Sequence, residues 1–216
     1  MDLGVVPKAD TPWLDYAQIL TFVDAIRDTP VELPALLALH SLRRSEIFAL
    51  RPEDIDLKAE TISVSGATVY TSSAEWIRRE ENKSARSQRV VPIVIPRLLE
   101  ILQDHNGDIC ALGDGVRRQI NRICAANDLP EVGLHGLRRS FASLAYHLGW
   151  SEEETMRHGG WSDWKTVHDF YLRLSEKDLS KAAKKMRRFY SVSKSVSKKG
   201  SKNAPKRTSA IPPSAE

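Results

Sequence analysis

Residues 135–148 read HGLRRSFASLAYHL, and their pattern predicts a helix with one apolar and one polar side. The apolar positions recur at helical spacing, and Gly149 ends the helix. His135 and Arg138 are three residues apart, so they lie on the same face. A lone histidine near a helix start is more often a cap or a core group. A histidine beside an arginine, whose planar fork donates two hydrogen bonds, is instead a candidate anion site.

Apolar patterns on either side of this stretch predict further helices and one small sheet. Helices are expected at about residues 14–26, 33–39, 42–51, 96–103, 115–126, 151–160, 164–174 and 178–190. Between Pro52 and Pro96 the pattern changes to an alternation of period two, which predicts strands at 61–65, 68–70 and 89–94. These elements predict an α+β fold, mainly helical, with a small three-stranded antiparallel sheet inserted early.

The positive charge of the chain lies in its last residues. The 216 residues carry a net charge of +4, but residues 191–216 hold six lysines and arginines against one glutamate, so residues 1–190 carry a net −1. We expect residues 1–12 to form a linker, residues 13–190 one domain, and residues 191–216 a disordered basic tail. The net charge therefore does not by itself predict a nucleic-acid-binding body.

The composition also excludes several classes of protein. Two cysteines, Cys110 and Cys124, are too few for a disulfide framework or a zinc knuckle, and both are expected to be reduced. The sequence has no run of about 18 apolar residues, the length that a membrane-spanning helix needs. Its first residues show no basic segment followed by an apolar run, as a secretory signal would. We therefore expect a cytoplasmic protein without a membrane partner.

Three further segments carry polar or aromatic side chains for which a structural interpretation is the simplest. Residues 42–46 read LRRSE and begin a predicted helix, where a pair of arginines is usually solvated. Residues 83–92 read KSARSQRVVP. They begin in a charged, hairpin-like connection, where a lysine usually lies at the surface, and continue into a predicted strand. Residues 160–161 read GW and residues 171–174 read YLRL, and aromatic residues at helical spacing usually pack in a core.

In chain order these pieces form the series Leu-Arg-x-Ser-Glu, Lys-x3-Ser-x-Arg-x-Val-Pro, His-x-x-Arg, Gly-Trp and Tyr. The series resembles the catalytic domain of the tyrosine recombinases, which are the integrases of phages and integrative elements. The resemblance runs from about Thr11 to Tyr190. Each motif alone is weak, whereas the ordered set, with each motif on its expected element, is specific. Trp161 stands where many members of the family have a second histidine.

The resemblance implies a site for DNA cleavage. Arg43 and Arg138 would hold the non-bridging oxygens of the scissile phosphate and stabilise its five-coordinate state. Tyr171 would be the nucleophile, forming a covalent 3′-phosphotyrosine link and leaving a free 5′-hydroxyl. Lys83 is the candidate general acid for the 5′ leaving oxygen, a role that needs a lowered lysine pKa.

The remaining roles implied by the resemblance support these groups. His135 would assist proton transfer, Trp161 would donate from its indole nitrogen or pack under the phosphate, and Glu46 would brace Arg43. The chemistry needs neither a metal ion nor a nucleotide cofactor, because the bond energy is kept in the protein–DNA ester. Four other arginines are expected to be backbone-phosphate contacts or solvated neighbours: Arg44, Arg86, Arg89 and Arg139.

One spacing departs from the commonest family pattern. The nucleophilic tyrosine usually lies nine residues after the second histidine or its tryptophan replacement, and that position here is Phe170. Either the loop is one residue longer and Tyr171 is the nucleophile, or Phe170 occupies the slot in an inactivated protein. The run Tyr-Leu-Arg-Leu at 171–174 resembles the Tyr-x-His-Leu run of relatives, which favours Tyr171. Helical spacing does not separate the two.

The resemblance also implies partners. Full-length members place DNA-binding domains ahead of this one, so we expect a fragment that is monomeric alone and forms a tetramer on double-stranded attachment sites in the full-length protein. The helix at 178–190 resembles a segment that relatives lend to a neighbouring protomer. An excisionase or a host DNA-bending factor would be a further partner. Two alternatives are a type IB topoisomerase, which relaxes DNA without exchanging strands, and a non-catalytic DNA-binding regulator.

Overall fold

The computed structural model describes residues 11–71, 76–79, 88–105, 109, 115–172, 174, 183–184 and 187. The chain divides into two units, Met1–Leu172 and Arg173–Glu216, and the second is described only at four helical residues. Several of the predicted segments lie outside the described residues. These are the linker up to residue 10, the hairpin with Lys83 and Arg86, most of the helix at 178–190, and the tail.

Helices make up most of the first unit, as the sequence predicts. They are α1 (Tyr16–Ala25), α2 (Glu32–Leu39), α3 (Arg44–Ile47), α4 (Pro96–Asp104), α5 (Gly115–Ala126), α6 (Leu134–His147) and α7 (Glu152–Gly159), and residues 164–172 are also helical. The helix expected at 42–51 is wrong in length. Arg43 is extended and caps α3, which ends after one turn, and a separate 3-10 turn, η1 (Pro52–Asp54), follows.

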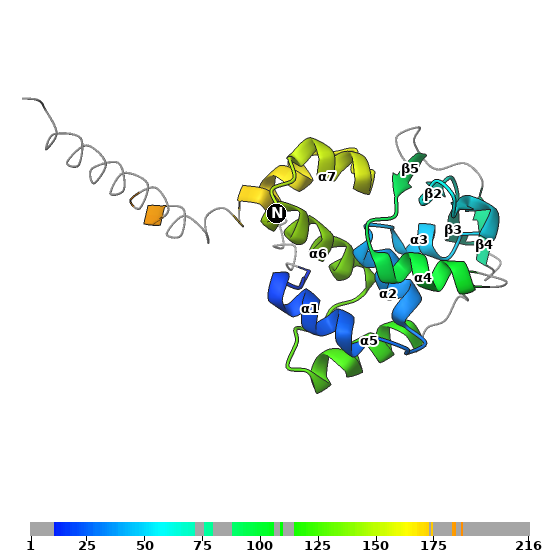
Figure 1. Ribbon diagram of the computed structural model, residues 1–216, viewed down its shortest axis with the longest axis horizontal. Coiled ribbons are helices and arrows are strands. Elements are labelled where there is room, and N and C mark those ends of the chain that lie inside the picture. The colour runs from blue at the N-terminus through cyan, green and yellow to red at the C-terminus, as the bar shows by residue number, and fades with distance from the viewer. Residues whose placement is uncertain are drawn as a thin grey trace, which may run out of the picture. The chain divides into compact units, whose positions relative to one another are not determined.

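Helix α6 lies at the centre of the unit (Figure 1), with α2 packed against it and α1 beside it. Leu137 and Phe141 on α6 are buried, and every residue of α2 except the partly buried Leu33 is buried. The segment that leads into α1 is tied to α6, because the Leu14 N–H donates to Ser140 Oγ at 2.8 Å. The core therefore fixes α6, and with it the polar face that carries His135 and Arg138.

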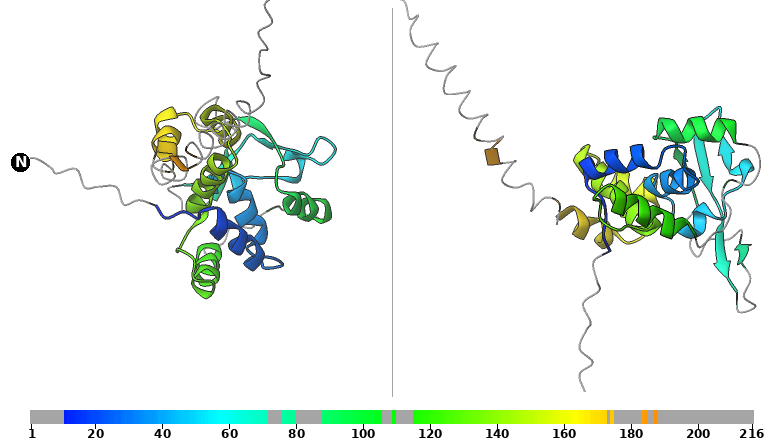
Figure 2. Two further views of the ribbon diagram at one scale, coloured as in Figure 1. Left: turned by 60° about the vertical axis from the view of Figure 1, so that its left-hand side comes forward. Right: turned by 90° about the horizontal axis from the view of Figure 1, so that it is seen from below.

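The strands form two sheets at one end of the helical body (Figure 2). In the first sheet, β1 (Ile55–Asp56), β2 (Thr61–Val64) and β5 (Arg89–Pro92) pair antiparallel in the order β1-β2-β5. In the second, β3 (Ala67–Tyr70) pairs antiparallel with β4 (Trp76–Arg79). The predicted α+β class and its three-stranded antiparallel sheet are confirmed. The assignment of 68–70 to that sheet is wrong, since β1 takes its place.

Gly66, between β2 and β3, marks the separation of the two sheets. A Cβ at Gly66 would come within 2.8 Å of the Arg78 guanidinium, so glycine leaves room for that side chain here. Arg78 reaches from β4 to the carbonyl of Ala49 at 2.8 Å and to the carboxylate of Asp54 at 3.3 Å. These contacts join the β3–β4 hairpin to the segment between α3 and β1.

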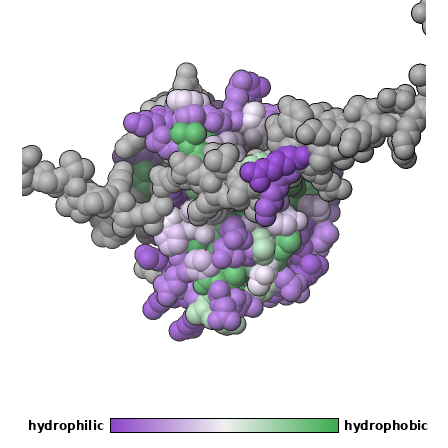
Figure 3. All heavy atoms as spheres, turned by 90° about the vertical axis from the view of Figure 1, so that its left-hand side faces the viewer, coloured by the Kyte–Doolittle hydropathy of each residue, from purple (hydrophilic) through white to green (hydrophobic). Residues whose placement is uncertain are grey.

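The surface that faces the viewer in Figure 3 is mainly hydrophilic, with smaller hydrophobic areas between the polar side chains. Among the described residues, no helix combines the length and the apolar composition needed to cross a membrane.

Two histidines are buried together in the core. The rings of His40 and His158 lie 4.8 Å apart, and His40 Nε2 accepts a hydrogen bond from the Val94 N–H at 3.1 Å. Burial lowers the pKa of His40 to about 3 and that of His158 to about 4. The positive charge of Arg89 also disfavours the cationic form of both rings, and for His40 the charge of His158 does so as well. Both imidazoles are therefore neutral in the folded protein above about pH 5.

Acidification is expected to destabilise the fold before the carboxylates titrate. Because both folded pKa values lie below the unfolded value of about 6.5, the unfolded chain takes up protons first, and stability falls as the pH drops below 6.5. The loss is on the order of 2 kcal/mol per histidine by pH 5, and His135, whose pKa is also lowered, adds in the same direction. Urea unfolding at pH 5, 6 and 7 measures it. The variant His158→Leu should show a shallower pH dependence, and an unchanged slope would contradict this assignment.

Candidate active site

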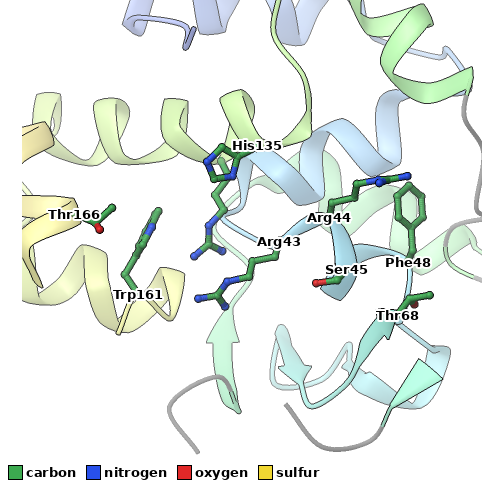
Figure 4. Close-up of a pocket in the computed structure, with 9 residues that line it drawn as sticks. Arg43, Arg44, Ser45, Phe48, Thr68, His135, Trp161 and Thr166 are labelled. Carbon is green, nitrogen blue, oxygen red and sulfur yellow. The ribbon is translucent and has the colours of Figure 1, made fainter. Parts of the chain in front are cut away.

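A cavity of about 460 Å³ opens where four distant parts of the first unit meet. Figure 4 shows the side chains around it, with those of Arg43, His135 and Trp161 turned toward one another. Nine residues line the cavity: Arg43, Arg44, Ser45, Phe48, Thr68, His135, Arg138, Trp161 and Thr166. Four of the seven site residues predicted from the sequence are thus brought together from the α3 segment, from α6 and from the loop after α7.

Arg43 is the residue immediately before α3, and its backbone is extended. Its Nη1 donates to Glu46 Oε1 at 2.6 Å, and its Nη2 donates to the carbonyl of Gly160 at 2.6 Å. The side chain is 35% exposed, so the guanidinium is held from behind and open to the cavity in front. The arrangement leaves Arg43 able to receive an anion without a change of rotamer.

Arg138 is held more deeply. Its Nη2 donates to the Gly159 carbonyl at 2.7 Å, and its Nη1 donates to the carbonyl of Ser41, a residue in the left-handed region with φ 79°. The guanidinium carbon lies 4.3 Å from the centre of the Trp161 ring, a cation–π geometry. Burial, followed by the positive charge of Arg43, lowers the pKa of Arg138 to about 9, so it is a cation at neutral pH.

His135 and Trp161 complete the wall on this side. His135 lies in the first turn of α6 and lines the cavity. Burial, followed by the charges of Arg138, Arg139 and Arg43, lowers the pKa of His135 and so favours its neutral form. A neutral imidazole can donate a hydrogen bond to a reacting oxygen or accept a proton from it. Trp161 covers Arg138 and excludes water from that side.

Glu46 is buried behind the arginines and balances them. Its carboxylate is 2% exposed and pairs with Arg43 and with Arg89, while Arg138 Nη1 lies 3.9 Å away. Burial alone would raise its pKa, but the hydrogen bonds and charge of Arg89, followed by Arg43, hold the pKa of Glu46 below its usual value. One buried anion thus faces three cations, so this part of the molecule has an excess of positive charge.

Three of the arginines expected to be phosphate contacts or solvated neighbours fall among the described residues, and they differ. Arg89 is buried with 7% of its side chain exposed, which contradicts the expectation. Arg139 is directed away from the cavity, donates to the Thr11 carbonyl at 2.9 Å and lies 5.5 Å from the Phe170 ring centre. Arg44 is exposed and points away from Arg43 beside Phe48 (Figure 4), so it alone keeps the expected character.

Tyr171 does not line the cavity in this structure. It is 7% exposed, and its hydroxyl shares a 2.6 Å hydrogen bond with Thr155 Oγ1 on α7. Burial, opposed by Thr155 and aided by the nearby carboxylates of Glu152 and Glu154, raises the pKa of Tyr171. Phe170 is also buried and packs edge-on against Trp13, with ring centres 5.2 Å apart. The structure therefore places neither ring among the cavity-lining side chains.

The pair Gly159-Gly160 allows the arginines to approach the end of α7. A Cβ on Gly159 would overlap the Trp161 ring and come within 2.6 Å of Ser41 Oγ. Gly160 has φ 64°, a left-handed conformation that suits glycine, and a Cβ there would meet Arg89 Nη1 at 2.8 Å.

The variant Gly159→Ala is expected to displace Trp161 from Arg138 and to destabilise the fold by roughly 1–3 kcal/mol, the usual cost of overpacking. Thermal and urea unfolding measure the loss. Gly115→Ala is the matched control, since Gly115 is also a helical glycine without a positive φ, and no atom lies within 4 Å of its added Cβ. Equal losses in the two variants would show that the close approach of Trp161 does not set the cost.

Sequence reasoning missed several side chains of the site. Phe48, Thr68 and Thr166 line the cavity, and nothing in their local pattern distinguishes them from surface or core residues. Ser45, which also lines it, is the serine of the Leu-Arg-x-Ser-Glu motif, but no role was assigned to it. Arg89 occurs in the quoted Arg-x-Val-Pro run at the start of β5, but its burial against Glu46 has no signal in that local pattern. Within the described residues, no three His, Cys, Asp or Glu side chains are grouped as metal ligands.

Comparison with solved structures shows that this fold is similar to that of integrases and recombinases. The integrase of transposon Tn1549, solved with transposon right-end DNA, superposes with a TM-score of 0.63 and 17% identity over 85% of this chain and 69% of that one. The XerA recombinase gives a TM-score of 0.61 and 17% identity, over 85% of this chain and 66% of that one. At this identity the likeness concerns the fold.

The chain belongs to the phage integrase family, whose pattern matches residues 12–178. The resemblance inferred from the sequence is thereby confirmed. A prophage integrase, IntF of Escherichia coli K12, is 29% identical over 157 residues, which cover 64% of this chain and 30% of that protein. The chain thus spans about a third of the length of this relative.

Proposed function

We propose that this chain is the catalytic domain of an integrase that cuts and rejoins double-stranded DNA at specific sites through a covalent 3′-phosphotyrosine intermediate. The observation that carries the proposal is the meeting of Arg43, Arg138, His135 and Trp161 at one cavity with an excess of positive charge. The four residues are separated by up to 118 positions in the sequence, and their ordered pattern occurs within the matched family region.

The two arginines supply the electrostatic part of the reaction. A phosphodiester that enters the cavity presents two non-bridging oxygens, and Arg43 and Arg138 both line the cavity with guanidinium groups already fixed by the neighbouring carbonyls of Gly160 and Gly159. Negative charge on these oxygens grows in the five-coordinate transition state, so donors held in advance favour that state over the ground state.

The covalent step exchanges one ester for another. The Tyr171 oxygen bonds to phosphorus, the bond from phosphorus to the 5′ oxygen breaks, and a proton goes to that 5′ oxygen. We assign this proton to Lys83, which lies outside the described residues, and the removal of the tyrosine proton to a path assisted by His135. The reverse attack by a 5′-hydroxyl reseals the strand, so the ester energy is retained.

Tyr171 must leave Thr155 for this step. In the structure the hydroxyl is buried and its pKa is raised, both of which disfavour a phenolate. Moving residues 164–172 so that the hydroxyl faces Arg43 and Arg138 would expose it to two cations, which favour the phenolate. DNA binding and assembly into a tetramer on the attachment site would supply the free energy for that movement. An excisionase or a host DNA-bending factor would select the direction of recombination, in the cytoplasm of a bacterial host.

A nicked suicide substrate tests the proposal. A duplex carrying the end sequence of the encoding element, nicked so that the 5′ product diffuses away, traps a covalent adduct after cleavage. We expect an adduct that survives denaturing electrophoresis, and a recombinant junction when an acceptor strand with a free 5′-hydroxyl is added. Relaxation of supercoiled DNA without a junction would indicate topoisomerase action instead. Binding without any adduct would contradict the enzymatic function.

A further inference from the structure

Arg89 lies behind the cavity and does not line it. It is the first residue of β5 and pairs across the sheet with Val64 of β2, so its backbone is fixed in a ladder. Its side chain runs beneath Gly160, where an added Cβ would meet the guanidinium at 2.8 Å, and is 7% exposed. A phosphate in the cavity would therefore reach Arg43 without touching Arg89.

The Arg89 guanidinium grips Glu46 with two parallel hydrogen bonds. Nη1 donates to Oε1 at 3.1 Å and Nη2 donates to Oε2 at 3.0 Å. A bidentate pair fixes the plane of the carboxylate as well as its position. Glu46 Oε1 then accepts from Arg43 Nη1 at 2.6 Å, and Oε2 accepts from the Arg43 N–H at 2.7 Å. Each carboxylate oxygen of Glu46 thus accepts hydrogen bonds from both arginines. The orientation of Arg43 therefore depends on a carboxylate that Arg89 holds in place.

The end of α7 provides a second set of fixed points. Three consecutive carbonyls each accept from a different arginine: His158 from Arg89 Nε at 3.0 Å, Gly159 from Arg138 Nη2 at 2.7 Å, and Gly160 from Arg43 Nη2 at 2.6 Å. The last carbonyls of a helix lack partners within the helix and carry the negative end of its dipole. They therefore attract cations, and their spacing sets the spacing of the guanidinium groups.

We propose that Arg89 is a positioning residue for DNA cleavage, acting on the phosphate only through Glu46 and the end of α7. The inference rests on the proposed function and deepens it, because it makes a third arginine, Arg89, responsible for aligning Arg43. Two other roles for Arg89 make different predictions. A phosphate contact would contribute to DNA affinity and to its salt dependence. A purely structural residue would affect stability but not the rate at which folded, DNA-bound protein reacts.

A double-mutant cycle with Glu46 separates positioning from independent action. The variants are Arg89→Gln, Glu46→Gln and both together, and the rate of adduct formation is measured in a single turnover at saturating protein. Removal of a group that orients a reacting one typically costs 10- to 100-fold, and we expect each single variant to lose roughly this much. Because both act through the same carboxylate, the double variant should react no more slowly than the slower single one. Losses that multiply would overturn the proposal.

The salt dependence of DNA binding supplies a second readout. One lost phosphate contact lowers the slope of log K against log salt by roughly 0.9. We expect the slope to be unchanged in Arg89→Gln and to fall by about this amount in Arg44→Gln, the exposed arginine at the rim of the cavity. A reduced slope in Arg89→Gln would make Arg89 a phosphate contact. Arg89→Lys, which keeps the charge but cannot hold a carboxylate bidentately, should lie between wild type and Arg89→Gln in rate.

A measurement without DNA keeps the inference separate from the proposed function. In protein labelled with ¹⁵N at the arginine side chains, the Arg43 Nε–H order is read from its heteronuclear NOE. We expect an ordered Arg43 side chain in the wild type and in Arg139→Lys, and a mobile one in Arg89→Gln. The unfolding temperature of Arg89→Gln, measured separately, shows that the variant is folded under the NMR conditions. An equally ordered Arg43 in Arg89→Gln would overturn the inference. Absence of adduct in the wild type would overturn the proposed function alone.

Discussion

Replacement of Tyr171 by phenylalanine is expected to abolish the covalent protein–DNA adduct while leaving the fold intact. The change removes one hydroxyl, and with it the 2.6 Å hydrogen bond to Thr155. Loss of one such bond costs about 1 kcal/mol, which is small beside the stability of a domain. The adduct, in contrast, cannot form without the oxygen. Denaturing electrophoresis of the trapped complex and urea unfolding measure the two effects.

Tyr146→Phe is the matched control for this variant. Tyr146 lies edge-on to Tyr171, with ring centres 5.1 Å apart, and its hydroxyl has no part in the proposed chemistry. We expect it to form the adduct at nearly the wild-type rate. The double variant Phe170→Tyr/Tyr171→Phe tests the one-residue ambiguity in spacing. Adduct formation by this double variant, together with an unreactive wild type, would assign the nucleophile slot to position 170 and contradict our choice.

Replacement of Arg138 by lysine is expected to slow cleavage by roughly 10²- to 10³-fold, the usual cost of removing one preorganised donor to a developing oxyanion. The guanidinium donates to the carbonyls of Ser41 and Gly159, and its carbon lies over the Trp161 ring, 4.3 Å from the ring centre. A lysine ammonium keeps the charge but cannot make this planar set of contacts. Single-turnover adduct formation measures the rate, and circular dichroism at the assay temperature shows whether the variant is folded.

The neighbouring arginine provides the comparison for Arg138. Arg139→Lys changes the same side chain one residue further along α6, where the guanidinium contacts the Thr11 carbonyl and the Phe170 ring outside the cavity. We expect the loss of cleavage rate in Arg139→Lys to be at least ten times smaller than the loss in Arg138→Lys. Equal losses in the two variants would mean that α6 as a whole, not the group in the cavity, governs the rate.

The sequence predicted the parts of the fold that depend on local periodicity and caps. The apolar series in 135–148 predicted α6, and the helix expected at 151–160 is α7, which begins after the N-cap Ser151 and has the left-handed Gly160 as its C-cap. The sheets were predicted less well. The pairing of β1 with β2 and of β3 with β4, and the contacts of Arg78 with Ala49 and Asp54, join residues apart in the sequence and have no local pattern.

The site shows the same division. The ordered motifs identified Arg43, Arg138, His135 and Trp161, which the fold brings to one cavity. Arg89 was misassigned, because a basic residue at a strand start has the same local pattern whether it is solvated or bound to a buried carboxylate. Its burial follows only from Glu46, 43 positions earlier in the chain. The placement of Tyr171 against Thr155 likewise depends on how residues 164–172 pack on α7.

The central claim is that Tyr171 becomes joined to DNA at this cavity, and peptide mapping of the trapped adduct tests it most directly. The adduct formed on the nicked substrate is digested with trypsin and nuclease, and the modified peptide is sequenced by mass spectrometry. We predict a nucleotide linked through its 3′-phosphate to Tyr171, in a peptide that includes Phe170. A 5′-phosphate linkage, or a nucleotide on any residue other than Tyr171, would contradict it.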